Sequence, residues 1–247
     1  MTDASSLAAS TPIIVGAGQF TERLGAPDFS GLAAYEIATR AAERAMNDAL
    51  SVEKLRPVVD AIATTRIFED STPRRAQPFG KSNNFPHSIA TRLGIAPKVA
   101  VWEKSGGNTP QHLVSEFAAR LAEGEVRMVV IAGAENISTA RWLQSQGRRA
   151  DWSETVDGAV ENRGMGLQGL ALRYNIRHGL LGTAPYYGLC ENARRGRLGV
   201  DIAEPDRRIP FRRRRPERRD LRAVAVESAP HEGNAFDLAG IGDEVPR

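Results

Sequence analysis

The chain has 247 residues, of which 41% are hydrophobic and 26% charged, with a formal net charge of +3. This length allows one large domain or two small ones, and the composition is that of an ordinary globular protein. A single cysteine, Cys190, excludes an intrachain disulfide, and no run of about 18 apolar residues is present to span a membrane. The first twelve residues lack the basic and apolar segments of a signal peptide, so we expect a cytoplasmic protein.

Apolar and amphipathic segments alternate between residues 11 and 138. Four apolar segments predict buried strands: 11–19, 58–68, 98–104 and 126–138. Helices are predicted over 30–50, around 87–95 and from 109 to about 124, with Ser30 and Thr109 as N-caps and a loop over 69–86. Strands that alternate with helices of this length form parallel sheets with right-handed crossovers. The predicted fold class is therefore α/β with a mainly parallel sheet, and residues 11–138 are its core.

The pattern loosens after residue 138. Residues 139–199 contain helical pieces separated by glycines, including a helix over 189–199, and no clear strand. This predicts an α-rich loop or insertion domain. Residues 200–247 form a third region, an irregular tail rich in arginine and proline, in which prolines 205, 210 and 216 interrupt any helix.

The turn in "VWEKSGGNTPQHL" (101–113) follows a strand and precedes a helix, where open α/β sheets bind ligands. The backbone N–H groups of Gly106 and Gly107 lie near a helix N-terminus, which suits an oxyanion or a phosphate. The plainer interpretation is a glycine-rich turn capped by Thr109. A nucleophilic Ser105 would need a base, and the pattern is not the G-x-S-x-G turn of hydrolases.

Other residues that could carry chemistry give weaker signals. His87 and His112 fall on predicted helices and His178 in the insertion, where surface or packing roles are expected. No spacing of histidines, cysteines and carboxylates resembles a metal site, so no metal is predicted. The Gly-Ala-Gly at 16–18 lacks the third glycine and the downstream acid of a dinucleotide site. Cys190 is expected to be a packing residue on a helix.

Four segments resemble the N-terminal half of the thiolase superfamily: "TPIIVGAGQFTER", "VDAIATTRIF", "WEKSGGNTPQHLVSEFAARLAEGEVRMVVIAGAENIS" and "APYYGLCENARRGRLG". The match covers residues 11–199 and is closest to thiolase-like acetyl-CoA acetyltransferases related to sterol-carrier-protein thiolases. The resemblance implies a βαβαβ half-fold followed by an α-rich loop domain, with the C-terminal half absent. It also implies a homodimer built around the third strand, or association with a full-length thiolase-like relative.

The resemblance implies acyl transfer on coenzyme A thioesters in lipid metabolism, with an acyl-CoA substrate and no other cofactor. Ser105 falls on the position of the family's nucleophilic cysteine, and Gly106, Gly107 and Asn108 fall on its substrate-binding and oxyanion turn. Serine is a weaker nucleophile than a thiolate at neutral pH. The family's second half also supplies a histidine and a Cys-x-Gly turn, and neither Gly-His-Pro nor Cys-x-Gly occurs in this sequence. Impaired acetyl-CoA acetyltransferase activity is therefore expected, with a non-catalytic binding or assembly subunit as the alternative.

The basic charge is concentrated in residues 207–222, which hold nine arginines and two acids. Such a run can bind nucleic acid or another anion, a second alternative, but it offers no aromatic residue beyond Phe211 for base stacking. The chain has four lysines against 29 arginines, which indicates GC-rich coding. The abrupt change of composition after residue 199 therefore favours a shifted reading frame over an evolved anion-binding tail, and sequencing the locus would distinguish them.

Overall fold

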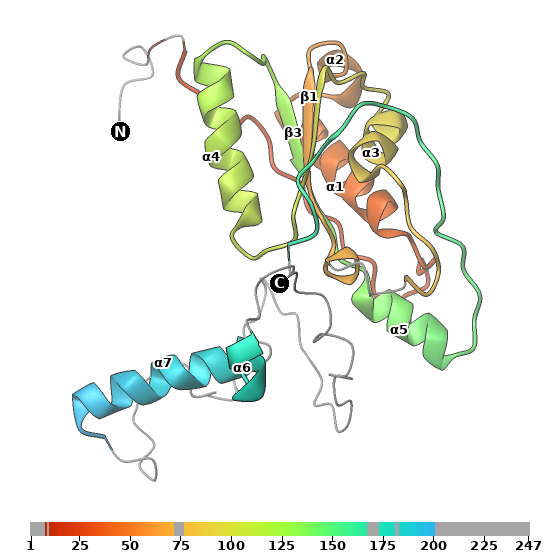
Figure 1. The fold of residues 1–247 in the computed structure, drawn as a ribbon. Coiled ribbons are helices and arrows are strands. Elements are labelled where there is room, and N and C mark those ends of the chain that lie inside the picture. The colour runs from red at the N-terminus through yellow and green to blue at the C-terminus, as the bar shows by residue number, and fades with distance from the viewer. Residues whose placement is uncertain (1–7, 9, 72–76, 167–172, 181–182, 201–247) are drawn as a thin grey trace, which may run out of the picture. The chain divides into compact units, whose positions relative to one another are not determined.

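The computed structural model describes residues 8, 10–71, 77–166, 173–180 and 183–200 (Figure 1). The chain separates into two compact units, residues 1–170 and 171–247. Within the described ranges, no helix is long and apolar enough to cross a membrane. The larger unit contains the sheet and the turn at Ser105. The arginine-rich run 207–222 lies outside the described residues.

A four-stranded sheet lies at the centre of the larger unit, in the order β3-β1-β2-β4. The inner strand β1 (Ala61–Thr65) pairs with β2 (Val99–Glu103) on one side and with β3 (Val129–Ala132) on the other. The short strand β4 (Glu161–Asn162) adds to the outer edge of β2. All of these pairings are parallel. The predicted α/β class with a mainly parallel sheet is confirmed.

Helices cover both faces of the sheet (Figure 1). Helices α1 (Ala34–Ala49) and α3 (Phe85–Leu93) pack on one face and α4 (Thr109–Ala122) packs on the other. Successive strand residues alternate between the two: Ile62 and Trp102 belong to the core beneath α1 and α3, whereas Val101 packs with Leu113 and Phe117 of α4. The remaining helices are α2 (Val52–Leu55), the 3-10 helix η2 (Phe68–Asp70), α5 (Ile137–Ser145), α6 (Arg173–Arg177) and α7 (Thr183–Leu198).

Two predicted helix starts differ from the structure. Helix α1 begins at Ala34, and Ser30 does not cap it because its hydroxyl and N–H both donate to the Glu22 carboxylate. The Glu36 carboxylate instead accepts the N–H of Ala33, at 2.8 Å. At α4 the N-cap position is Asn108, and Thr109 is already helical. Ser30 is held by Glu22 while Glu36, inside α1, caps that helix, and the Thr109 hydroxyl is bound to the Lys104 carbonyl.

The predicted strand over 11–19 is wrong: these residues form no strand and lie along α1. The carbonyl of Ala45 stands 2.2 Å from where a Cβ on Gly16 would be, and the carbonyl of Ala41 stands equally close to Gly18. The Ala17 N–H donates to the Asp48 carboxylate at 3.0 Å. The two glycines therefore allow the backbone of this segment to approach that of α1 closely. This contact accounts for the Gly-Ala-Gly sequence, and no nucleotide-binding role is needed to explain it. The apolar residues face solvent, with Ile14 83% exposed.

Replacing Gly18 by alanine should destabilise the larger unit by about 1–3 kcal/mol, because the new Cβ would overlap the backbone of α1. The measurement is the urea midpoint of unfolding. Gly107→Ala is the matched control, since no atom lies within 4 Å of its added Cβ. Equal midpoints for the two variants would mean that residues 11–19 do not rest on α1.

In the described part of 139–199 the structure has the end of α5, α6 and α7, whereas residues 146–166 form no helix. The predicted helix 189–199 is part of α7, which begins six residues earlier at Thr183. Cys190 lies on this helix but is exposed, so its predicted packing role is wrong. Within the smaller unit, the Tyr174 ring lies 4.4 Å from that of His178. Strand β4 was not predicted, because two exposed residues carry no strand pattern of their own.

Candidate functional site

The turn between β2 and α4 holds Ser105 at the carboxyl edge of the sheet, where the sequence predicts it. The Thr109 hydroxyl donates to the Lys104 carbonyl at 3.1 Å, and the Thr109 N–H donates to the Gly106 carbonyl at 3.1 Å. These two bonds close the turn. Gly106, Gly107 and Asn108 are exposed, and Ser105 is half-buried. Within the described residues the N–H groups of Gly106 and Gly107 have no hydrogen-bond acceptor, so both are available to a ligand oxygen.

The segment that follows β4 covers Ser105. The Ser105 N–H donates to the carbonyl of Met165 at 3.2 Å. A Cβ on Gly166 would lie 2.3 Å from the Ser105 carbonyl oxygen, and Gly166 has a φ of +104°, a conformation that suits only glycine. Residues 162–166 are called the covering segment below. A ligand oxygen that used the Ser105 N–H would first have to displace the Met165 carbonyl.

No base is seen beside the Ser105 hydroxyl. Across the ranges that the structure describes, Ser105 Oγ forms no hydrogen bond to a histidine or a carboxylate. The His87 Nε2 lies 2.9 Å from the Ala159 carbonyl, and His112 Nδ1 lies 3.4 Å from the Glu103 carboxylate. His178 belongs to the smaller unit. Without a base, a serine hydroxyl at neutral pH is a poor nucleophile.

Arg163 anchors the covering segment through a cluster of ion pairs. Its Nη1 lies 2.7 Å from Glu103 and 2.5 Å from Glu116, and its Nε lies 2.9 Å from Glu161. The Glu103 side chain is only 2% exposed, so this is a desolvated pair. Glu103 ends β2 and Glu116 is on α4. One guanidinium therefore joins the two elements that flank the Ser105 turn.

The ion pairs shift the pKa values of the cluster. Burial raises the pKa of Glu103, but hydrogen bonds from Arg163 and the Lys104 N–H outweigh it, and the pKa lies below its ordinary value. The pKa of Glu116 is lowered chiefly by hydrogen bonds from Arg163. In turn the carboxylate of Glu116, followed by those of Glu161 and Glu103, raises the pKa of Arg163. The carboxylates of Glu103 and Glu116 are therefore ionised at neutral pH.

The folded protein should lose stability as the pH falls below about 4.5, the ordinary pKa of these carboxyl groups. Because the pKa values of Glu103 and Glu116 are depressed in the folded state, the unfolded chain takes up protons first, and acid favours unfolding. Urea midpoints between about pH 3 and pH 7 measure this dependence. The Glu116→Gln variant should show a shallower decline, and an unchanged decline would contradict the assignment.

Three potential metal ligands also meet in this cluster, although their sequence spacing did not suggest it. Ligand atoms of Glu103, His112 and Glu116 all lie within 4.8 Å of one another. Both carboxylates already bind the guanidinium of Arg163, which supplies the positive charge at their centre. A metal ion would have to compete with this cation, so we assign the cluster to the anchoring of the covering segment.

A second buried arginine holds the same segment from the other side of β2. Arg66 donates through Nε to the Gly164 carbonyl at 3.0 Å and through Nη2 to Asn162 Oδ1 at 2.7 Å. Its Nη1 pairs with Asp70 at 2.5 Å, and both side chains are at most 3% exposed. The guanidinium carbon stands 3.7 Å from the centre of the Trp102 ring. Two arginines therefore fix the segment that covers Ser105.

The fold of this chain is similar to that of a solved structure. The crystal structure of a monomeric SCP2-thiolase like protein type 1 from Mycobacterium smegmatis is similar over 78% of this chain, with 32% sequence identity and a TM-score of 0.51. The chain has a thiolase-like fold. It spans 30% of the length of the mycobacterial protein. No protein-family model and no curated protein matches this chain.

The thiolase-like fold places the Ser105 turn as the sequence predicted, but the contacts around it were missed. Arg163 lies 60 residues from Glu103 and 47 from Glu116 in the chain. Neither spacing forms a motif. The available signal was indirect: Glu103 ends an apolar strand, and a charge at such a buried position requires a partner. The sequence does not say which of the many arginines provides it.

Proposed function

We propose that this thiolase-like chain binds acyl-CoA thioesters at the turn of Ser105, Gly106, Gly107 and Asn108, and that its own acetyl-CoA acetyltransferase activity is weak. The observation that carries the proposal is the position of Ser105 at the tip of the β2–α4 turn, beside two unoccupied N–H groups. Weak turnover is inferred because no base lies beside Ser105 among the described residues, and because the Ser105 N–H is bound to the Met165 carbonyl.

The chemistry can be tested by restoring a thiol at position 105. In a Ser105→Cys variant the thiolate attacks the carbonyl carbon of acetyl-CoA. A new carbon–sulfur bond forms, the bond to coenzyme A breaks, and the CoA thiolate leaves. Because Cys190 is exposed, both Ser105→Cys and the Ser105 parent are made in a Cys190→Ala background. Intact-mass spectrometry then counts acetyl groups on each protein.

We expect one acetyl group on the Ser105→Cys variant and none on its parent or on Ser105→Ala. Turnover of acetyl-CoA and acetoacetyl-CoA by the wild type should be at background. Wild-type turnover that Ser105→Ala abolishes would contradict the weak activity and identify a serine nucleophile. Absence of acetylation in Ser105→Cys, with acetyl-CoA binding also absent by calorimetry, would overturn the binding proposal.

A non-catalytic assembly role is the second candidate, and the face of the sheet under α4 favours it. In the described part of the larger unit, α4 is the single helix on this face, and Val114 on it is 37% exposed. Leu121 on the same helix and Val99, Val129 and Ile131 on the sheet beneath it are only partly buried. Light scattering after size exclusion should give the mass of a dimer or a larger assembly, and a strictly monomeric mass would count against this role.

A further inference from the structure

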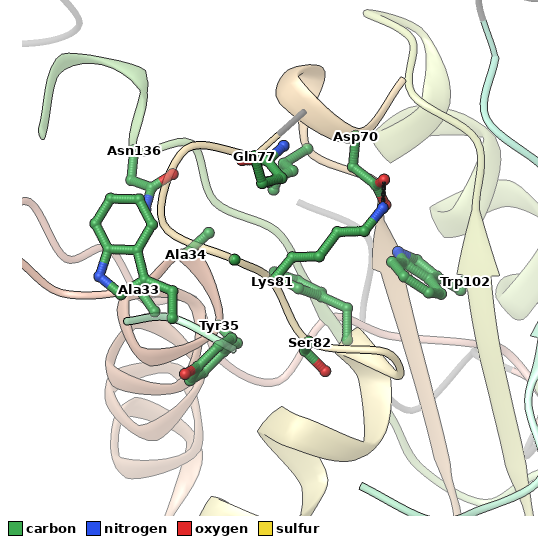
Figure 2. A pocket seen from close by; sticks show the side chains of 13 residues that line it. Ala33, Ala34, Tyr35, Asp70, Gln77, Lys81, Ser82, Trp102 and Asn136 are labelled. Atoms are coloured by element: carbon green, nitrogen blue, oxygen red, sulfur yellow. Dashed lines mark hydrogen bonds and ion pairs between the residues drawn. The ribbon is translucent and has the colours of Figure 1, made fainter. Parts of the chain in front are cut away.

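A small cavity lies on the opposite face of the sheet from α4. Its volume is about 20 Å³, and its walls come from β2, the start of α1, the start of α5 and the loop that joins β1 to α3 (Figure 2). The polar residues among them are Tyr35, Asp70, Gln77, Lys81, Ser82, Trp102 and Asn136. Trp152, Gly80 and the side chains of two alanines, an isoleucine and a phenylalanine complete the lining. The Ser105 turn does not contribute to it.

Two hydrogen-bond donors on the wall of this cavity have no partner among the described residues. Trp102 is 6% exposed, and its buried Nε1–H forms no hydrogen bond within the described residues. The buried Nε2 of Gln77 is likewise without a partner there. Figure 2 shows the indole nitrogen of Trp102 on the side of the ring toward Lys81 and Asp70. Buried donors in folded proteins are nearly always paired, with the protein or with ordered water.

The neighbouring tryptophan shows the usual arrangement. Trp152 also lines the cavity, and its Nε1 donates to the Gly31 carbonyl at 3.1 Å. The fold therefore pairs one indole of this wall with the backbone and leaves the other for a different acceptor. Trp102 on β2 and Gln77 in the β1–α3 loop border the same cavity, so one acceptor in it lies between these two elements.

The size and the charges of the cavity restrict what the acceptor is. A water molecule needs about 10–15 Å³ of such space and two to four polar partners, so about 20 Å³ holds one water and no larger ligand. A water also needs acceptors. The Asp70 carboxylate, 2% exposed, pairs with Arg66 and Lys81, and a carboxylate offers about four acceptor sites. It can therefore accept from a water as well.

We propose that this cavity binds one ordered water molecule, which accepts hydrogen bonds from Trp102 Nε1 and Gln77 Nε2 and donates to Asp70. The water joins the β1–α3 loop to β2 at Trp102, on whose ring the Arg66 guanidinium stacks. It is a site separate from the acyl-CoA turn and does not depend on the proposed function.

Heteronuclear NMR of the full chain tests this through the three indole N–H signals, assigned with single Trp→Phe variants. The Trp102 Hε1 should show a dipolar cross-peak to water with the sign of a long-lived, protein-bound molecule. Trp152, bonded to Gly31, should show none. Trp142 is partly exposed and serves as the signal for ordinary solvent contact. A Trp102 signal without a water cross-peak would overturn the proposal.

The bridge to Gln77 is tested by Gln77→Met, an apolar replacement of similar length, beside Gln146→Met at an exposed position. We expect Gln77→Met to abolish the Trp102–water cross-peak and Gln146→Met to leave it intact. A cross-peak that survives Gln77→Met would refute the bridge. The Trp102 signal is also followed during titration with sodium iodide and, at equal ionic strength, with sodium fluoride. A saturable shift with iodide alone would show that the cavity binds a halide rather than water, and this too would overturn the proposal.

Discussion

Replacing Arg163 by methionine should lower the free energy of unfolding by about 3–5 kcal/mol, because removing one partner of a buried pair leaves an uncompensated charge. The charge left behind is Glu103, 2% exposed, whose remaining contacts are the Lys104 N–H and His112. Methionine keeps the length and the apolar stem of the side chain. The loss in free energy of unfolding therefore measures the contribution of the guanidinium charge and its hydrogen bonds. Urea unfolding at pH 7 measures it.

The matched control is Arg127→Met. Arg127 also pairs with a carboxylate, Asp60 at 3.5 Å, but its side chain is 64% exposed. Asp60 is itself only 9% exposed, but it keeps the hydrogen bonds that the backbone N–H groups of Arg127 and Met128 donate to it, so this variant should lose at most about 1 kcal/mol. Adding Glu103→Gln to Arg163→Met should recover part of the loss, since no buried charge then remains. Equal midpoints for the Arg163 and Arg127 variants would show that Glu103 is not desolvated in solution.

The same substitution connects stability to the candidate site. Arg163 holds the covering segment, and that segment supplies the carbonyl of Met165 that accepts the Ser105 N–H. In Arg163→Met we therefore expect the Ser105 amide hydrogen to exchange faster with solvent, beyond the change in amides of the core strand β1. An equal increase in the exchange rates of the Ser105 amide and of the β1 amides would mean that the covering segment opens only when the whole unit unfolds.

Asp70→Ala should also destabilise the larger unit by about 3–5 kcal/mol, because it removes the carboxylate that neutralises buried Arg66. Arg66 would keep its hydrogen bonds to Gly164 and Asn162. These neutral oxygens satisfy the N–H groups of Arg66 but do not balance its positive charge. Lys81 would lose its partner as well. Thermal and urea unfolding at pH 7 measure the change.

Asp157→Ala provides the control for Asp70, since Asp157 is exposed and such surface changes usually stay within about 0.5 kcal/mol. The double variant Arg66→Met with Asp70→Leu should be more stable than Asp70→Ala alone, because apolar residues of similar volume often replace a buried ion pair at little cost. A double variant less stable than Asp70→Ala would show that Arg66 matters through Gly164 and Asn162 rather than through its charge balance.

Much of the sheet and of the Ser105 turn could be predicted because their signals are local. Apolar residues at successive positions predict β1 and β2 wherever they occur in the chain, and Gly106, Gly107 and Pro110 mark the end of one element and the start of the next. The predicted strands were too long at both ends, because the residues that flank the paired segments carry no local signal for where the hydrogen-bonded ladder stops. The resemblance to thiolases was confirmed at the level of the fold.

The failures share a physical cause. Residues 11–19 have the composition of a buried strand, but a strand forms only where another strand offers its edge, and these residues lie instead on α1 through Gly16 and Gly18. Strand β4 is the converse case, two exposed residues that pair because the covering segment passes the edge of β2. Whether a segment forms a strand depends on a neighbouring strand as well as on its own residues, and the composition of the segment says nothing about that neighbour.

The sequence by itself determined the α/β class, the helix that starts after the glycine-rich turn, and the presence of serine at its tip. The tertiary structure alone decided that the Ser105 N–H faces Met165, and that Arg163 reaches Glu103 and Glu116 across 60 and 47 residues. Backbone propensity acts between near neighbours and can be read along the chain. The choice of ion-pair partner depends on which side chains the packed sheet brings within a few ångströms, and that is a property of the whole fold.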